Sequence, residues 1–448
     1  MKWSDYNYIY ESSRHGTLLF NKLTGAFFDI SDPETKAEML KLKEDPDGYD
    51  FTDDPEACQK LLSAGVICND DDETARNMLT YSLLAARFSP SVKYLTLLPT
   101  LDCNLACTYC FEEAHRCSGM MSQEVVDKLK EIIETEYGDG KEPLMLSWFG
   151  GEPLLGYGIM KEITGHALSL GISLEAGIIT NGVLLNESRI NELDELKINN
   201  IQITLDGKRE THDKKRKFRN GRGTYDIILA NMSALHAYME CTGAKIHVDI
   251  RINVDRENKD QYHGLLVELK ERFPLFTVYP GIITQYRSCG TSLPCFADQR
   301  EEALFYIEQY EKYGIIHPEF DISGKGMRSC MAEMVNTQIV GPKGEIYLCL
   351  QDVGNPHAVA GTLFDGKNNM PLVSAYCSGN LTFNSRKCRD CEVLTFCGGG
   401  CVNKRYRTKK YNEPHDVCAA YKDKDIFEKY LDLHYEIKKR NEQNVQRK

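Results

Sequence analysis

Short apolar runs alternate with amphipathic helical patterns between residues 90 and 285. Six runs have the length of buried strands, and the segments between them place apolar residues three and four positions apart. Such alternation predicts an α/β fold in which a parallel sheet curves into a partial, TIM-like (β/α)6 barrel. The predicted strands are residues 94–98, 144–148, 176–179, 201–205, 247–254 and 277–282, and the predicted helices are 123–137, 158–170, 187–196, 225–238 and 260–272.

The segment before this region, residues 1–85, has a different pattern. Three short strands are predicted at 7–10, 17–20 and 26–30, because turn-forming residues separate them. Helices are predicted at 33–42 and 55–64, each beginning at a proline. The pattern indicates a small three-stranded domain with helices. It would either recognise an extended peptide at a sheet edge or simply stabilise the chain.

The C-terminal part of the chain divides into three segments. Residues 286–326 form a bridge that contains a predicted helix at 303–313. Residues 327–425 are rich in cysteine. Residues 426–448 are predicted to form a polar C-terminal helix, beginning near residue 424, with a fraying tail.

Composition narrows the class of protein. The chain has 448 residues, of which 42% are hydrophobic and 27% charged, as in globular proteins. Its net charge of −12 argues against nucleic acid or an anionic membrane as a partner. No stretch resembles a membrane span or signal peptide, so we expect a cytoplasmic protein. In that compartment the 17 cysteines are expected to bind metal and not to form disulfides.

Three cysteines follow the first predicted barrel strand at C-x3-C-x2-C spacing: Cys103, Cys107 and Cys110. A loop with this spacing can place three thiolates on one four-iron cube and leave the fourth iron without a protein ligand. An iron with an open position can bind a small molecule. The alternatives are a zinc knuckle or three unrelated buried thiols.

This cysteine pattern resembles the signature of the radical S-adenosylmethionine (SAM) enzymes, in which the open iron chelates the methionine end of SAM. The second predicted strand is followed by Gly150, Gly151, Glu152 and Pro153. That run resembles the family's GGEP motif, which grips the SAM amino group, although an ordinary Gly-Gly turn is the alternative. The resemblance also implies SAM contacts at later strand ends and in the cysteine loop, namely at Thr180, Asn181, Asn253 and Tyr109.

Asp206 directly follows the fourth predicted strand, and a strongly basic stretch comes after it. Asp206 is a candidate substrate contact or catalytic base, with capping of the turn as the alternative. Residues 208–222 are expected to form a solvated loop, or a loop that attracts an acidic peptide. Related enzymes have a similar Leu-Asp-Gly, His-Asp and Arg pattern, here at 205–207, His212-Asp213 and Arg216.

The C-terminal cysteines resemble the SPASM domain of radical SAM enzymes, which houses two auxiliary [4Fe–4S] clusters. The resemblance implies that one cluster is held by Cys388, Cys391, Cys397 and Cys418, and the other by Cys330, Cys349 and Cys401. The second would keep an open iron unless Cys289 or Cys295 closes it. Cys117 lies near the SAM loop, with no role that the pattern assigns. A pair of zinc ribbons is the competing interpretation of the C-terminal series.

Taken together, these resemblances imply a peptide maturase with SAM and three [4Fe–4S] clusters as cofactors. A 5′-deoxyadenosyl radical would abstract hydrogen from a ribosomally made precursor peptide and install a cross-link, in our interpretation a cysteine sulfur-to-carbon thioether. The N-terminal segment resembles winged-helix-like domains that bind the leader of such a precursor. A flavodoxin- or ferredoxin-type protein would donate the electron. The alternatives are an anaerobic sulfatase-maturing enzyme that makes formylglycine and a non-catalytic iron–sulfur electron carrier.

Overall fold

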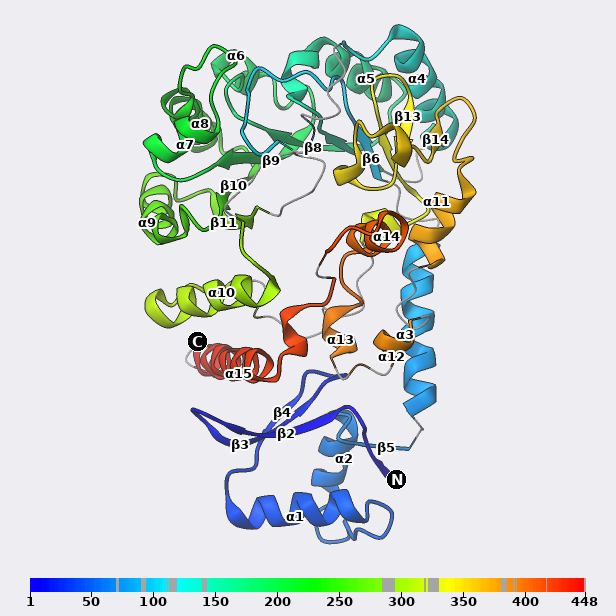
Figure 1. The fold of residues 1–448 in the computed structure, drawn as a ribbon, viewed down its shortest axis with the longest axis vertical. Helices are drawn as coiled ribbons and strands as arrows, with labels where there is room; N and C mark the ends of the chain where they lie inside the picture. Colours follow the sequence, from blue (N-terminus) through cyan, green and yellow to red (C-terminus); the bar gives the residue numbers. More distant parts are fainter. Residues whose placement is uncertain are drawn as a thin grey trace. The chain divides into compact units, whose positions relative to one another are not determined.

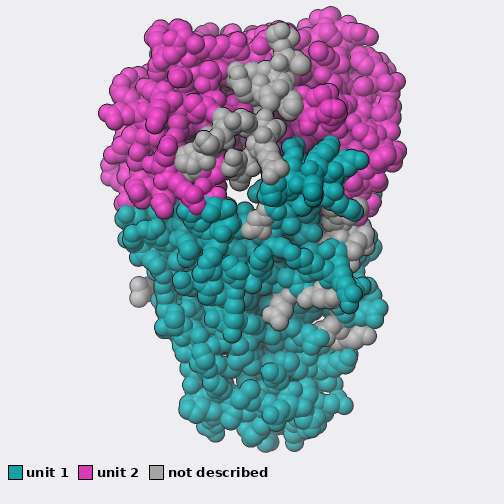
Figure 2. Space-filling view, in the orientation of Figure 1, with its two compact units in different colours: residues 1–88, 297–330, 379–448 teal, residues 89–296, 331–378 magenta. Residues whose placement is uncertain are grey.

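The computed structural model describes most of the chain, and it divides into two compact units (Figure 2). Unit 1 comprises residues 1–88, 297–330 and 379–448, and unit 2 comprises residues 89–296 and 331–378. The described residues are 1–69, 72–89, 94–110, 112, 119–138, 143–283, 295–317, 320, 330–379, 385–389, 391, 393–415 and 417–446.

Unit 2 is built on a nine-stranded sheet whose order is β11-β10-β9-β8-β7-β6-β12-β13-β14. Strands β6 to β11 run parallel to their neighbours, which confirms the predicted α/β fold. These six strands are β6 (Tyr94–Leu97), β7 (Leu144–Trp148), β8 (Leu174–Thr180), β9 (Ile198–Leu205), β10 (His247–Val254) and β11 (Thr277–Ile282).

The helices of unit 2 alternate with these strands and lie along the outer side of the curved sheet (Figure 1). The predicted helices are confirmed, but α6 ends five residues earlier than expected, at Asn191. A helix at Arg209–Lys215, α7, occupies part of the expected solvated loop. The others are α4 (Gln123–Tyr137), α5 (Tyr157–Ser169), α8 (Tyr225–Thr242) and α9 (Tyr262–Arg272).

The beginning of the cysteine-rich region extends the same sheet. Strand β12 (Thr337–Val340) pairs in parallel with β6, and β13 (Glu345–Tyr347) and β14 (Gly361–Thr362) continue antiparallel. Helix α11 (Met370–Ser374) follows. None of these strands was predicted, since each is short and lacks a clear apolar alternation.

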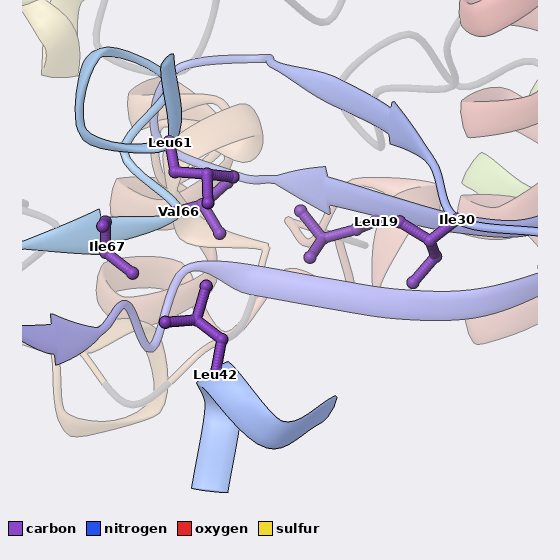
Figure 3. Packing of buried hydrophobic residues seen from close by; sticks show 6 residues of the cluster. All are labelled: Leu19, Ile30, Leu42, Leu61, Val66 and Ile67. Atoms are coloured by element: carbon purple, nitrogen blue, oxygen red, sulfur yellow. The ribbon is translucent and has the colours of Figure 1, made fainter. Parts of the chain in front are cut away.

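Unit 1 contains the N-terminal sheet of β2 (Asn7–Ser12), β3 (Gly16–Asn21) and β4 (Phe27–Asp29), as predicted. Helices α1 (Pro33–Glu44) and α2 (Pro55–Ser63) begin after aspartate caps and are also confirmed. Strands β1 (Lys2–Trp3) and β5 (Ile67–Cys68) pair, and the unpredicted α3 (Asp72–Arg87) follows. Figure 3 shows the core on one face of the sheet, formed by Leu19, Ile30, Leu42, Leu61, Val66 and Ile67.

Helix α15 (Lys424–Gln446) packs against the same N-terminal sheet. The Tyr8 hydroxyl donates to Glu428 at 2.9 Å, and the Phe27 ring lies 5.4 Å from that of Tyr435. The expectation of a merely polar helix is therefore wrong, because one side of α15 is buried. Unit 1 also contains α10 (Gln299–Tyr313), α12 (Arg386–Arg389), α13 (Leu394–Cys397) and α14 (Val402–Tyr411). No helix in the described ranges has both the length and the apolar character to cross a membrane.

Candidate functional site

The cysteine loop begins at Cys103, six positions after the end of β6. Backbone hydrogen bonds hold it to the basic segment, residues 208–222. The Ala106 N–H donates to the Lys217 carbonyl at 2.8 Å, and the Thr108 N–H donates to the Lys215 carbonyl at 3.0 Å. Cys103 is buried, whereas Cys107 and Cys110 are half-buried. The basic segment is thus a structural support of the loop.

Gly150 and Gly151 pack against the chain that leads into the cysteine loop. A Cβ atom at Gly150 would overlap the Thr100 carbonyl oxygen, and one at Gly151 would overlap the Asp102 carbonyl oxygen. Gly150 also has a φ of 121°, which favours glycine. The two glycines therefore permit a close backbone approach, and the partner that they approach is the cysteine-bearing segment.

The Glu152 carboxylate is fully buried and accepts three hydrogen bonds from its own unit. Its donors are the Thr180 hydroxyl at 2.8 Å, the Asn181 N–H at 2.8 Å and the Leu154 N–H at 3.1 Å. Burial raises the pKa of Glu152, and these hydrogen bonds oppose the rise. The carboxylate thus ties the ends of β7 and β8 together.

Asn181 connects the end of β8 to the cysteine loop. Its side-chain amide donates to Asn104 Oδ1 at 2.7 Å and lies 3.7 Å from Cys103 Sγ. Its own Oδ1 accepts from the Val183 N–H at 3.0 Å. The predicted residues Thr180, Asn181 and Glu152 therefore lie together beside Cys103.

A second group of predicted residues meets at the Tyr109 hydroxyl. This hydroxyl donates to Asp206 Oδ1 at 2.7 Å and accepts from Asn253 at 2.9 Å and from Arg216 at 2.8 Å. Burial raises the pKa of Asp206, which the Arg216 charge and the Tyr109 hydrogen bond oppose. The ends of β9 and β10, the residue after α7 and the cysteine loop thus converge on one hydroxyl.

The Leu-Asp-Gly, His-Asp and Arg pattern has a structural explanation in this arrangement. His212 Nδ1 accepts from the Asp206 N–H at 3.3 Å, and Nε2 lies 3.0 Å from the Thr224 hydroxyl. That hydroxyl donates to the Arg216 carbonyl at 2.6 Å, so Nε2 is the protonated nitrogen. Asp213 accepts from two backbone N–H groups at the start of α8.

The expectation of a solvated basic loop is wrong for three of its members. His212, Lys215 and Arg216 are buried. Lys215 forms an ion pair with Asp255, and their side chains are 7% and 2% exposed. Charge alone suggested exposure because the sequence does not show the buried carboxylate that pairs with Lys215.

The unpaired donor and acceptor atoms around the cysteine loop suit a bound polar cofactor. Asp206 Oδ2, Arg216 Nε and Asn104 Nδ2 are buried and have no hydrogen-bond partner within the described ranges. Such atoms cost about 1–3 kcal/mol each unless a ligand or water satisfies them. No three Cys, His, Asp or Glu side chains of the described chain converge as a single-ion site requires. A four-iron cube binds each thiolate at a separate corner and does not need that convergence.

The C-terminal cysteines are distributed over both units. Cys388, Cys391, Cys397 and Cys418 all belong to unit 1. Burial raises the pKa of the Cys391 thiol, and the other three sulfurs raise it further, so these four thiols are neighbours. Cys330 and Cys401 belong to unit 1, and Cys349 and the buried Cys295 to unit 2. Cys117 and Cys289 lie outside the described residues.

Sequence reasoning placed Arg216 only within a family pattern and did not identify Asn104 or Lys215 as part of the site. In the sequence, only the positions of these residues next to recognised motifs pointed to the site. Asn104 follows the first cysteine, and Lys215 and Arg216 lie in the basic stretch. Adjacency shows where a residue is in the chain but not whether its side chain turns inward.

Comparisons with known proteins bear on this site. The model of the radical SAM superfamily matches residues 97–265. A cysteine-type anaerobic sulfatase-maturating enzyme of Clostridium novyi is 30% identical over 149 residues, which cover 31% of this chain and only 38% of that relative. The radical SAM cyclopropyl synthase TigE of Paramaledivibacter caminithermalis is 21% identical over 368 residues, covering 74% of this chain and 72% of TigE.

Solved structures that share the fold include those of anSMEcpe and SuiB. Native anSMEcpe with bound AdoMet superposes with a TM-score of 0.58 at 17% identity and covers 79% of this chain and 100% of its own. SuiB of Streptococcus suis, bound to S-adenosylmethionine, has a TM-score of 0.52 at 18% identity. The match covers 93% of this chain and 100% of the SuiB chain. SuiB has also been solved bound to its precursor peptide SuiA. Residues 97–265 of this chain therefore match the radical SAM superfamily, and the chain shares the α/β fold of anSMEcpe and SuiB.

Proposed function

We propose that this chain is a cytoplasmic peptide maturase that installs a cross-link in a ribosomally made precursor, specifically a cysteine sulfur-to-carbon thioether. The observation that carries the proposal is the position of the cysteine loop. It is tied to the ends of β8, β9 and β10 through Asn181 and Tyr109, beside buried polar atoms that have no partner in the described chain. Ligands bind at such strand ends in parallel α/β folds.

In this proposal Cys103, Cys107 and Cys110 hold the SAM-binding cluster. When bound, SAM and this cluster supply a 5′-deoxyadenosyl radical for hydrogen abstraction from carbon. Four residues bind SAM or shape its binding site: Gly150, Gly151, Asn181 and Asn253. Tyr109 orients the polar groups around that site. Thr180 and Glu152 act through the hydrogen bonds that hold the two strand ends together.

Asp206 is our candidate for the substrate contact or base. Its backbone N–H and carbonyl are engaged by His212 and Asn258, so the turn is held by the backbone and not by the carboxylate. Oδ2 has no partner among the described residues, and burial raises the pKa of this carboxyl. A buried carboxylate whose pKa is raised is a stronger base, and its unused oxygen can accept a proton from a substrate.

The N-terminal sheet is our candidate for leader recognition. Its two faces are covered, one by the core of Figure 3 and the other by side chains of α15. Strands β2 and β4 each have only one strand neighbour within the described chain. We therefore propose that an extended leader adds to an edge of this sheet, with main-chain hydrogen bonds supplying affinity.

We propose a domain division at the boundaries expected from the sequence: recognition domain 1–85, barrel 90–285, bridge 286–326, SPASM domain 327–425 and C-terminal helix 426–448. Two auxiliary clusters on the seven C-terminal cysteines would raise the total to three. A flavodoxin- or ferredoxin-type protein would supply the electron. The grouping of Cys388, Cys391, Cys397 and Cys418 in unit 1 supports the first auxiliary site.

A second candidate function is sulfatase maturation, in which a cysteine or serine is oxidised to formylglycine. It is favoured by the sulfatase-maturating relative and by the shared fold of anSMEcpe. The additional N-terminal sheet and helices favour the cross-linking function.

The test begins with SAM cleavage by the reduced, anaerobically purified protein. Release of 5′-deoxyadenosine is expected, and its loss is expected when Cys103, Cys107 and Cys110 are all changed to alanine. Iron should fall from about twelve to about eight atoms per chain, on three four-iron cubes. A protein that releases no 5′-deoxyadenosine is an electron carrier, and the proposal is then wrong.

The substrate is tested separately, with a cysteine-containing precursor peptide encoded beside the enzyme. Cross-linking removes two hydrogen atoms per bond, requires the leader and consumes the cysteine thiol. Formylglycine on a sulfatase-derived peptide, with no change in the precursor, would identify the second function instead.

A further inference from the structure

Helix α14 begins immediately after Cys401 and carries an arginine that contacts another proposed cluster ligand. Arg405 Nη2 lies 2.9 Å from Cys388 Sγ. Its Nε donates to the carbonyl oxygen of Gly399. All three residues belong to unit 1.

The arginine thus connects two cysteine-bearing segments. Gly399 lies in the turn between Cys397 and Cys401, where Gly398, Gly399 and Gly400 all have positive φ values, from 57° to 95°. This conformation is one that glycine adopts readily. The turn brings the Gly399 carbonyl to Arg405, which fixes the guanidinium by a second contact while it reaches the Cys388 sulfur.

We propose that Arg405 is a positioning residue that raises the reduction potential of the auxiliary cluster held by Cys388, Cys391, Cys397 and Cys418. The inference rests on the ligand set of the proposed function. Cluster potentials depend on net charge and on hydrogen bonds to the ligand sulfurs. A fixed cation beside one thiolate stabilises the reduced cluster, which is more negative by one electron.

The geometry distinguishes arginine from lysine here. A guanidinium presents several N–H donors in a rigid plane and can contact the sulfur and the carbonyl together. The ammonium of lysine has the same charge but lacks this planar arrangement of donors. Arg405→Lys should therefore retain part of the effect and Arg405→Gln none of it. Lys409, exposed on the same helix, provides the matched control for loss of one positive charge.

The test is a redox titration, followed by electron paramagnetic resonance, of full-length protein in which Cys103, Cys107 and Cys110 are alanine. The paramagnetic resonance signal of this cluster is identified as the one that disappears when Cys391→Ala is added to these three substitutions. Arg405→Gln should lower the ratio of reduced to oxidised cluster at least tenfold at a given solution potential. For one electron, this corresponds to a fall of about 59 mV in the reduction potential of the cluster. Arg405→Lys should give a smaller shift, and Lys409→Gln none.

A second measurement needs no change at Arg405. In protein labelled with ¹⁵N-arginine, the reduced cluster should show a nitrogen hyperfine coupling, because a guanidinium nitrogen contacts its ligand. This measurement decides the question if Arg405→Gln loses iron. Absence of the coupling, or unchanged potentials in both Arg405 variants, overturns the inference.

The iron content of Cys391→Ala separates an error in the proposed ligand set from an error in the role of Arg405. If Cys391→Ala retains all of its iron, the ligand set in the proposed function is wrong. If Cys391→Ala loses about four irons while Arg405→Gln titrates like the control, only the role of Arg405 is wrong.

Discussion

The hydroxyl of Tyr109 donates a hydrogen bond to Oδ1 of Asp206 at 2.7 Å, across 97 residues of sequence. The same hydroxyl accepts from Arg216 and Asn253, so its one proton and both lone pairs are used. The cysteine loop is therefore fixed to the ends of β9 and β10 through a single buried atom.

Tyr109→Phe should destabilise the protein, because it leaves Asp206, Arg216 and Asn253 without their shared partner. A buried unsatisfied group costs about 1–3 kcal/mol. We expect a lower free energy of unfolding in anaerobic denaturant titrations. Tyr94→Phe is the control, since that side chain is 43% exposed. Equal midpoints for both variants would contradict the central role of the hydroxyl.

Gly151→Ala should displace the cysteine loop, because the new Cβ would overlap backbone oxygens of Leu101 and Asp102, which cannot rotate away. We expect reduced stability and less iron bound per chain after reconstitution. Gly158→Ala, on α5, has open space around the new methyl group. That variant should bind iron normally and be up to about 1 kcal/mol more stable, as expected for alanine in a helix. Normal iron binding by Gly151→Ala would argue against the close backbone approach.

Lys215→Met should leave Asp255 charged and buried without its partner. Breaking a buried pair in this way costs about 3–5 kcal/mol. The Lys215 carbonyl accepts from the Thr108 N–H, so a backbone shift that follows loss of the ion pair would disturb the cysteine loop, and iron retention should fall as well. Lys214→Met, at the exposed neighbouring position, should change neither property. Lys215→Met/Asp255→Leu should recover part of the lost stability, and no recovery would show that the pair is not coupled.

His212 should make stability depend on pH in the acidic range. Burial, with a contribution from Arg216, lowers the pKa of His212 to about 3 from its ordinary value of 6.5. Between these values the unfolded chain binds one more proton, so the free energy of unfolding rises with pH and falls on acidification. The expected slope approaches 1.4 kcal/mol per pH unit below about pH 6. His212→Gln should reduce that slope by one proton relative to wild type, and an unchanged slope would show that His212 is not neutral in the fold.

Local patterns in the sequence were sufficient for the parallel strands, most helices and the cysteine loop. Apolar periodicity reports which elements form, and spacings of two or three residues between cysteines are decided within a single loop. The placement of Gly150, Glu152 and Asn181 after successive strands also followed, because parallel strands end at the same edge of a sheet.

Only the tertiary structure decided which side chains meet. The partner of Tyr109 lies 97 residues away, and that of Tyr8 on α15 lies 420 residues away. Sequence gives a residue its charge and size, but burial depends on what distant strands and helices bring to it. Lys215 and Arg216 therefore belong to a buried site and not to a solvated loop, since Asp255 and Tyr109 are there to pair with them.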